Sequence, residues 1–317
     1  MNKLTRIVPV GLVTLALALA GCTNASQQET GSDGAGAGSS SSATADAGHG
    51  NDALLASIQK DPEIAKLLPS KIADKGVITV GSSADYAPAE FADTDGTTII
   101  GYDIDYAKAM GKLMGVDVKA SNATFDTLLP SVGSKFDIAL SSFTITAERE
   151  KQVNMISYFT AGMAKAVLKG NPKNVPADSL CGVTVAVSTG TSEDDDAQKQ
   201  SKECVAAGKK PATILSYKTL PEATTNVVGG KADISYGDSM IIAYSVARTN
   251  GTLEQLGGIT QAAPFGVVVA KNDDALAKAI QAATQKLIDD GTMKKILATW
   301  GNDGGMITKS EINPALK

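Results

Sequence analysis

Histidine is almost absent from this chain, which contains one His, one Trp and three Cys among 317 residues. The one histidine, His49, lies in a stretch rich in Gly, Ser and Ala, so the sequence lacks the grouped His and Cys residues of a zinc site. We therefore expect no metal and no cofactor. The same scarcity argues against enzymes that depend on a histidine base or a free cysteine nucleophile.

Basic residues are in the minority, because 29 Lys and Arg stand against 34 Asp and Glu, for a formal net charge of −5. The Lys and Arg are scattered, which argues against a nucleic-acid-binding protein. The apolar run from Val8 to Ala20 is too short for a comfortable membrane span. With 43% hydrophobic residues, the chain is long enough for one or two ordinary globular domains.

The N-terminus has the features of a sorting signal. Lys3 and Arg6 precede the apolar run, which ends in Leu19-Ala20-Gly21-Cys22. This ending resembles the lipobox of bacterial lipoproteins, in which the preceding segment is removed and the cysteine becomes the lipid-bearing first residue. The resemblance implies a signal peptide over 1–21, a palmitate-type lipid on Cys22, and an extracytoplasmic protein anchored to the outer face of the cell membrane.

Composition then divides the segment up to residue 75. Residues 22–52 have almost no large apolar side chains and predict a flexible linker, and residues 53–75 predict a short helical extension. With Cys22 assigned to a lipid, Cys181 and Cys204 remain. An exported chain with an even number of remaining cysteines favours a disulfide between them.

A strand expected at 136–140 is followed by clustered hydroxyl side chains: Ser141, Ser142 and Thr144. Arg149 comes next, on the first turn of an expected helix. Ligands dock at strand ends in open α/β sheets, and the arginine fork fits a carboxylate bidentately. The stretch therefore predicts an anion site, with Arg149 binding the charge and Thr144 completing the donors. The alternative is that Arg149 is a solvated helix residue beside two glutamates.

A motif in this region occurs twice. Val-Gly-Ser-Lys-Phe-Asp-Ile begins at Val132, and Val-Gly-Gly-Lys-Ala-Asp-Ile begins 96 residues later at Val228. Each copy ends a helix, turns at glycine and starts a strand, and Asp238 follows the second copy. Two copies of one α/β unit suggest two similar lobes. With Arg149 on one lobe and Asp238 on the other, the cleft walls would match the two charges of an amino acid zwitterion.

Strands and helices alternate through the remaining sequence, which is typical of parallel α/β sheets. We expect an α/β, two-lobed, periplasmic-binding-protein-like fold, in which each lobe is a mostly parallel sheet flanked by helices and a two-strand hinge joins the lobes. Asp95-Gly96 predicts a hairpin turn, and Asp103 and Asp105 are interpreted as helix-start charges. The expected boundaries are lobe 1 at 76–164 and 268–303, lobe 2 at 165–267, and a C-terminal tail at 304–317.

Short motifs over residues 76–303 together resemble an extracytoplasmic solute-binding protein of an ABC importer, in the polar-amino-acid class. They are Asp85-Tyr86-Ala87-Pro88-Ala89-Glu90-Phe91, Gly101-Tyr102-Asp103-Ile104-Asp105, Ser141-Ser142-Phe143-Thr144-Ile145-Thr146, Glu148-Arg149, Gly190-Thr191-Ser192, Ala232-Asp233-Ile234, Asp290-Gly291-Thr292 and Trp300-Gly301. The resemblance implies a monomeric receptor that captures a polar amino acid and delivers it to the transmembrane subunits of an ABC permease.

The resemblance also implies roles for individual residues. Arg149 would bind the ligand α-carboxylate, helped by Thr144 and by the backbone near Ser141 and Ser142. Asp238 and the carbonyl of Ser142 would receive the α-ammonium. The loop that would supply N–H groups to the carboxylate at a helix start consists of Gly190, Thr191 and Ser192. The aromatic walls would be Tyr86 and Phe125, for which core packing is the alternative.

Two positions depart from the family pattern. Ser83 stands where members that select basic amino acids often carry aspartate, which weakens a lysine or arginine ligand. Asp85, two residues on, is able to replace that aspartate, so the ligand side chain stays open. Ala89 replaces a common phenylalanine and would enlarge the cleft.

Two other functions remain as alternatives. Related folds host dehydratases, and three carboxylates here are suited to acid–base work: Asp85, Glu90 and Asp238. A sensor that signals to a membrane partner would use the same closure as a transport receptor.

Overall fold

The structure is a computed structural model that describes residues 50–316 of the chain. The chain divides into two units, Met1–Ser42 and Ala43–Lys317, and every described residue belongs to the second. The expected signal peptide, Cys22 and nearly all of the expected linker therefore lie outside the described residues. Between residues 50 and 316, no helix is long and apolar enough to span a bilayer.

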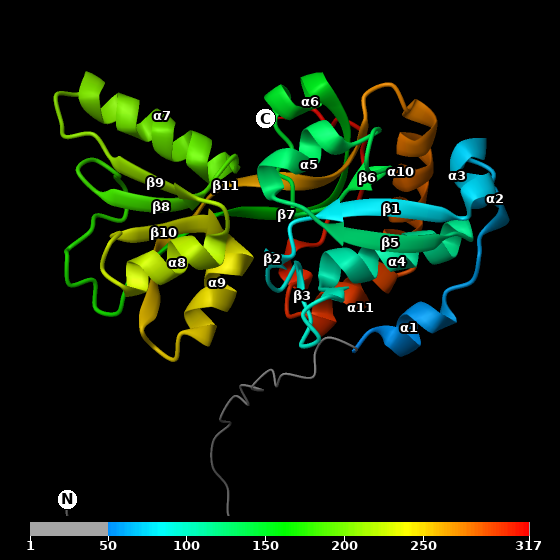
Figure 1. Ribbon diagram of the computed structural model, residues 1–317, viewed down its shortest axis with the longest axis horizontal. Coiled ribbons are helices and arrows are strands. Elements are labelled where there is room, and N and C mark those ends of the chain that lie inside the picture. The colour runs from blue at the N-terminus through cyan, green and yellow to red at the C-terminus, as the bar shows by residue number, and fades with distance from the viewer. Residues whose placement is uncertain (1–49, 317) are drawn as a thin grey trace, which may run out of the picture. The chain divides into compact units, whose positions relative to one another are not determined.

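The described unit has two lobes (Figure 1). Lobe 1 is built on three parallel strands: β1 (Val77–Ser82), β5 (Asp117–Asn122) and β6 (Ile138–Ala139). Its helices are α4 (Tyr102–Met114), α5 (Phe125–Ser131), α6 (Ala147–Gln152), α10 (Asp274–Asp289) and α11 (Thr292–Thr299). A small antiparallel sheet adds β2 (Asp85–Tyr86), β3 (Glu90–Ala92) and β4 (Ile99–Ile100).

Lobe 2 repeats the same alternation. Its parallel strands are β8 (Thr184–Ser188), β9 (Thr213–Tyr217) and β10 (Ile234–Asp238). Its helices are α7 (Ser192–Ala206), α8 (Leu220–Val228) and α9 (Ser239–Arg248). Strand β10 is buried along its whole length, as expected of a strand covered on both faces.

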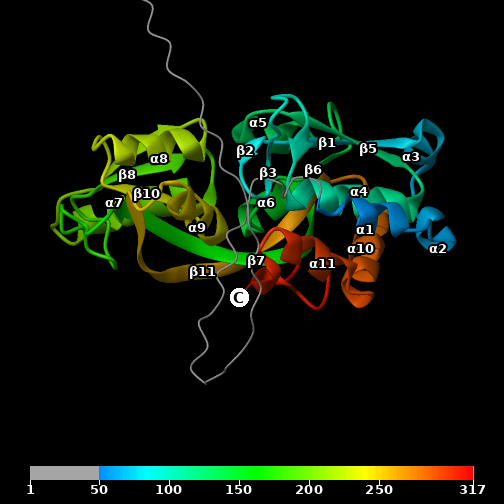
Figure 2. The ribbon, with the colours of Figure 1, turned by 90° about the horizontal axis from the view of Figure 1, so that it is seen from below.

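Two long strands, β7 (Val153–Leu168) and β11 (Leu253–Ala270), run from one lobe into the other (Figure 2). They join both halves into one sheet with the order β5-β1-β6-β11-β7-β10-β8-β9. The predicted two-lobed α/β fold with a two-strand crossing is confirmed. The half-sheets are continuous because β7 and β11 pair with each other in both lobes.

The pairing of the crossing strands is irregular in the middle. The register of β11 against β7 shifts between Leu256 and Thr260 and again between Thr260 and Ala263. Opposite this segment, β7 carries Gly162, where a Cβ would lie 2.5 Å from the Thr260 carbonyl oxygen and 2.6 Å from the Ile259 side chain. Glycine is required here because the two backbones approach too closely for any side chain.

The repeated motif produces the same contacts in each lobe. Asp137, just before β6, accepts bonds from the Thr79 N–H at 2.7 Å and from Lys75 Nζ at 2.5 Å. Asp233, just before β10, accepts bonds from the Thr184 N–H at 2.8 Å and from a lysine, Lys173, at 2.5 Å. Each aspartate therefore ties the start of its strand to the neighbouring parallel strand.

The first turn of α4 contains Asp103 and Asp105, as interpreted from the sequence. Both are also buried, with exposed fractions of 0% and 3%, which the sequence did not indicate. Asp105 accepts bonds from Asn51 at 2.8 Å and Trp300 at 2.9 Å, and Asp103 contacts residues far along the chain. The hairpin turn is as predicted, since the Asp95 carboxylate accepts the Thr97 and Thr98 N–H groups.

Both ends of the described chain pack on lobe 1. Three short helices precede β1: α1 (Asp52–Ser57), α2 (Pro62–Ala65) and α3 (Ser70–Lys75). After a 3-10 turn, η2 (Asp303–Gly305), the last segment bonds along β7, where the Ser157 N–H donates to the Glu311 carbonyl and Asn313 Oδ1 accepts from the Met155 N–H. In lobe 2, the disulfide Cys181–Cys204 is present as predicted, with a Cα–Cα distance of 5.5 Å.

Candidate functional site

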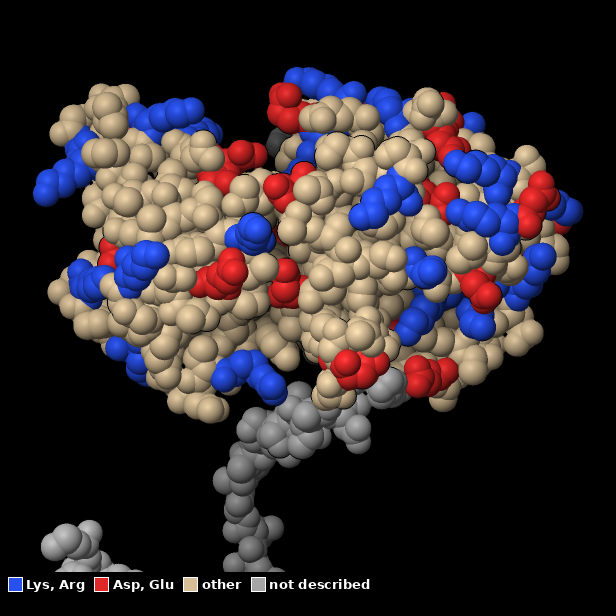
Figure 3. All heavy atoms as spheres, viewed as in Figure 1, with Lys and Arg blue, Asp and Glu red and all other residues tan. Residues whose placement is uncertain are grey.

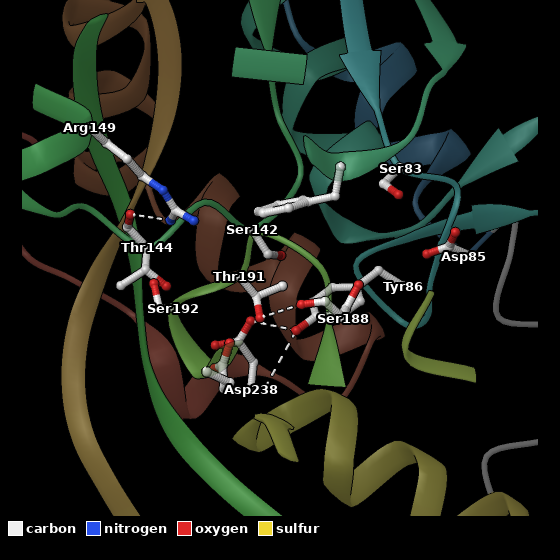
Figure 4. A pocket seen from close by; sticks show the side chains of 12 residues that line it. Ser83, Asp85, Tyr86, Ser142, Thr144, Arg149, Ser188, Thr191, Ser192 and Asp238 are labelled. Atoms are coloured by element: carbon white, nitrogen blue, oxygen red, sulfur yellow. Dashed lines mark hydrogen bonds between the residues drawn. The ribbon is translucent and has the colours of Figure 1, made fainter. Parts of the chain in front are cut away.

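A pocket lies between the lobes, where β1, β6, β8 and β10 end (Figure 4). Its walls consist of Ser83, Asp85, Tyr86, Phe125, Ser142, Thr144, Arg149, Ser188, Thr191, Ser192, Glu193 and Asp238. Figure 4 shows Arg149 and Thr144 on one side, Ser83 and Asp85 on the other, and Asp238 between them. The carboxyl ends of parallel strands from both lobes thus converge on one cavity.

The Arg149 guanidinium is held in place by two backbone carbonyls. Its Nη1 donates to the Thr144 carbonyl at 2.7 Å and its Nη2 to the Gly190 carbonyl, in lobe 2, at 3.1 Å. The group also lies 5.6 Å from the ring centroids of Phe125 and Phe143. A guanidinium has five N–H donors, so donors remain for an acceptor in the pocket.

The helix start that faces Arg149 comes from lobe 2. Thr191 is the N-cap of α7 and accepts the Asp194 N–H at 3.2 Å, after Gly190 turns the chain with φ +78°. Helix N-termini favour anions, but here Glu193, Asp194 and Asp195 occupy the first turn. Glu193 is 2% exposed, lines the pocket, and has an Oε1 atom with no hydrogen-bond partner in the described part of the chain.

Asp238 lies beside Glu193 at the end of β10. The Tyr86 hydroxyl, from lobe 1, donates to Asp238 Oδ2 at 2.7 Å across the cleft. Burial raises the pKa of Asp238 well above its usual value, and the neighbouring charge of Glu193 adds to the shift. Burial likewise raises the pKa of Glu193. A cation placed here would stabilise the ionised form of both carboxyl groups.

The wall from lobe 1 contributes Asp85 and Ser142. Burial raises the pKa of Asp85 to about 6, although a hydrogen bond from Ser83 opposes the shift. Ser142 has a left-handed backbone conformation, with φ +49°, and its N–H donates to Asp103 Oδ2 at 2.9 Å. The buried network behind the wall therefore fixes Ser142 in a conformation that is costly for a residue other than glycine.

Three comparisons with known proteins agree with this geometry. Residues 78–303 match the sequence profile of the bacterial extracellular solute-binding proteins, family 3. The chain belongs to this family. The match covers both lobes and the two crossing strands of this solute-binding protein.

Individual relatives support the assignment. The Arginine-binding protein ArgT of Corynebacterium glutamicum is 34% identical over 308 residues, which cover 96% of this chain and 94% of that protein. Among solved structures, an ancestral arginine-binding protein bound to arginine has a TM-score of 0.66 at 31% identity, covering 71% of this chain and 98% of that one. The ancestral amino acid-binding protein AncCDT-1, described as a precursor of cyclohexadienyl dehydratase, has a TM-score of 0.64 at 33% identity, covering 74% and 99% of the two chains.

Most residues predicted from the sequence of this solute-binding protein line the pocket, but Ser141 and Gly190 do not. Ser141 is buried, and its hydroxyl accepts the Ser83 N–H at 3.0 Å and donates to Glu90 at 2.6 Å. Gly190 is exposed beside the pocket, and its carbonyl accepts from Arg149. The sequence interpretation missed Ser188 and Glu193. Glu193 directly follows the predicted loop of Gly190, Thr191 and Ser192. This position at a helix start could have indicated that Glu193 lines the pocket.

The pKa of Asp85 generates a direct prediction. In the ligand-free protein, we expect the Asp85 carboxyl carbon to titrate with a midpoint near pH 6 in NMR spectra, because burial disfavours its charged form. Asp137 provides an internal comparison. Burial alone would raise its pKa, but bonds from Lys75 and Thr79 leave it lowered, so Asp137 should titrate below the usual range of an aspartate. An Asp85 midpoint below pH 4.5 would contradict the burial argument.

Proposed function

We propose that this protein is a non-enzymatic receptor that captures a polar amino acid between its lobes and delivers it to an ABC transporter permease. The observation that carries the proposal is the pocket itself, in which Arg149 and Asp238 face one cavity from different lobes. The relatives support the proposal through their names, because they are described as arginine-binding or amino acid-binding proteins.

Each end of the ligand has a matching group. The α-carboxylate would bind the free donors of Arg149, the Thr144 hydroxyl and the N–H groups around Thr191 and Ser192. The α-ammonium would bind Asp238, with the Ser142 carbonyl as a further acceptor. Tyr86 and Phe125 would enclose the ligand side chain, as aromatic residues commonly do in small-molecule sites.

The balance of charge favours a cationic side chain. Among the described residues, three carboxyl groups line the pocket, Asp85, Glu193 and Asp238, against one basic residue, Arg149. A neutral zwitterion leaves two of these carboxyl groups uncompensated, whereas a ligand such as arginine or lysine adds a second positive charge. We infer that Asp85 binds this second charge. Asp85 would thereby take the place of the aspartate that is common at the position of Ser83.

Closure would follow from the crossing strands. We propose that the two lobes move as two bodies about β7 and β11, lobe 1 comprising 76–164 and 268–303 and lobe 2 comprising 165–267. The irregular pairing opposite Gly162 would be the flexible point. The contacts of Arg149 with Gly190 and of Tyr86 with Asp238 cross the cleft and would form on closure.

A ligand screen tests the proposed function. A ligand that binds only the folded state raises stability by about 2.7 kcal/mol at a concentration of 100 times Kd. For a protein of this size, that is a rise in Tm of about 5 °C or more. We expect arginine and lysine to give the largest rise among the twenty amino acids, and aspartate and glutamate the smallest. The absence of any shift would contradict the receptor proposal, and recovery of a chemically changed ligand would favour the enzyme alternative.

Substitution of the two charged anchors tests the ligand orientation. Arg149→Ala leaves the ligand carboxylate buried and unpaired, which costs roughly 2–5 kcal/mol, or about 30-fold to several thousand-fold in Kd. Asp238→Asn should weaken binding less, because the amide oxygen still accepts a hydrogen bond. The exposed Arg248→Ala is the matched control and should keep the wild-type Kd in calorimetric titration. Unchanged affinity in a folded Arg149→Ala variant would place the carboxylate elsewhere.

We also propose that a lipid on Cys22 anchors the receptor to the outer face of the cell membrane and that it acts as a monomer. The lipobox-like sequence before Cys22 supports the anchor. We expect Cys22→Ala to move the protein from the membrane fraction to the soluble fraction with unchanged ligand affinity. Retention of the variant in the membrane fraction would contradict the anchor.

A further inference from the structure

Two carboxyl groups are buried directly behind the pocket wall. Glu90 of β3 and Asp103 of α4 are both 0% exposed. Neither forms an ion pair with any Lys or Arg within residues 50–316. Hydrogen bonds connect them to two pocket residues: Ser142 donates to Asp103 directly, and Ser83 is linked to Glu90 through the Ser141 hydroxyl.

The two carboxyl groups differ in the hydrogen bonds that they accept. Asp103 receives hydrogen bonds from the Tyr158 hydroxyl at 2.7 Å, from the Ser142 N–H at 2.9 Å and from the Ser142 hydroxyl at 3.3 Å. Glu90 Oε1 receives only the Ser141 hydroxyl at 2.6 Å, and Glu90 Oε2 is buried with no donor from the described residues. Donors stabilise a carboxylate, so Asp103 is the better site for the charge and Glu90 for the proton.

The Asp103 N–H donates to the Ala89 carbonyl at 3.0 Å, and the side chains of Glu90 and Asp103 are hydrogen-bonded to each other. Ionising both without a cation is costly, because burial penalises each charge and the charges repel. The titratable groups that face Glu90 are Asp103 and Tyr102 of α4, Tyr158 of β7 and Asp85 of β2, none of which is cationic. Burial raises the pKa of Glu90 well above its usual value, and Asp103 adds to the shift. Burial also raises the pKa of Asp103, to about 6, against the opposing hydrogen bonds.

We propose that Glu90 and Asp103 share one proton and act as positioning residues for the ligand site, Glu90 through Ser141 to the Ser83 backbone and Asp103 through Ser142. The Ser141 hydroxyl joins the ends of β1 and β6, because it accepts the Ser83 N–H and donates to Glu90. Asp103 holds the left-handed Ser142, whose carbonyl is the proposed acceptor for the ligand ammonium. The ligand-related half of this inference depends on the proposed function; the shared proton does not.

The first experiment tests, without any ligand, whether Glu90 carries the shared proton. The folded protein keeps the proton on Glu90, whereas the unfolded chain, with a Glu pKa of about 4.3, releases it above that pH. Raising the pH therefore favours unfolding, by up to about tenfold in the unfolding equilibrium constant per pH unit and per proton. Glu90→Gln keeps a neutral donor in place and should remove this one-proton dependence between pH 6 and 8 in urea titrations. The exposed Glu148→Gln is the matched control and should keep the wild-type slope.

The positioning role is tested with the ligand found by the screen. Glu90→Leu removes the acceptor of Ser141 and should weaken binding at pH 7 by about tenfold or more, with an unchanged near-UV circular dichroism spectrum. Glu90→Gln should restore most of the affinity, because its amide oxygen accepts from Ser141 and its N–H donates to Asp103. If Glu90→Leu does not fold, the comparison of Glu90→Gln with the wild type in urea still decides the shared proton.

Two results would overturn the inference. Equal pH slopes for the wild type and Glu90→Gln would show that Glu90 is not the proton carrier. Wild-type affinity in a folded Glu90→Leu variant would show that the pair does not position the site. The failure of every amino acid to bind the wild-type protein would instead contradict the proposed function, and the urea experiment would still test the proton.

Discussion

The position of the Arg149 guanidinium between the lobes is the constraint on which the rest of the site depends. A half-buried guanidinium needs acceptors, and its two carbonyl partners come from different lobes: Thr144 in lobe 1 and Gly190 in lobe 2. Burial lowers the pKa of Arg149, and the charges of Glu193, Asp195 and Asp238 oppose that shift. The acidic residues at the start of α7 therefore stabilise the cation on which the approach of the lobes depends.

Acidic groups outnumber basic ones in the pocket and in the network behind it. Acidic and basic side chains are scattered over the face shown in Figure 3, whereas the pocket and the network behind it concentrate carboxyl groups. Within a low dielectric, such groups take up protons unless a cation arrives. A cationic ligand would then release protons as it binds, and its affinity would depend on pH through Asp85. Its affinity would also depend on the ordering of Ser83 through Glu90 and of Ser142 through Asp103.

Local sequence patterns predicted the fold well, because the same motif makes the same strand-to-strand contacts in both lobes. The duplicated motif placed Asp137 and Asp233 before equivalent strands, and alternation of strands and helices indicated the two lobes. Where a motif carries a residue, as for Arg149, the residue lies in the pocket, and its role in binding stays a prediction. Glu193 was missed, and the burial of Asp103 was not foreseen, because burial depends on residues that are distant in sequence, such as Tyr158. Helix-start carboxylates look alike in sequence whether they are solvated or enclosed.

The positions of the two chain ends have a mechanical consequence. Asn51 is bonded to Asp105 and Thr299, and the final segment is bonded to Ser157, so both ends of the described chain are fastened to lobe 1. Within residues 50–316, lobe 2 is an insertion that meets lobe 1 covalently through β7 and β11 alone. Any pull transmitted along the N-terminal part of the chain therefore enters lobe 1 and bypasses the crossing strands. The proposed rotation of lobe 2 would therefore not carry that load.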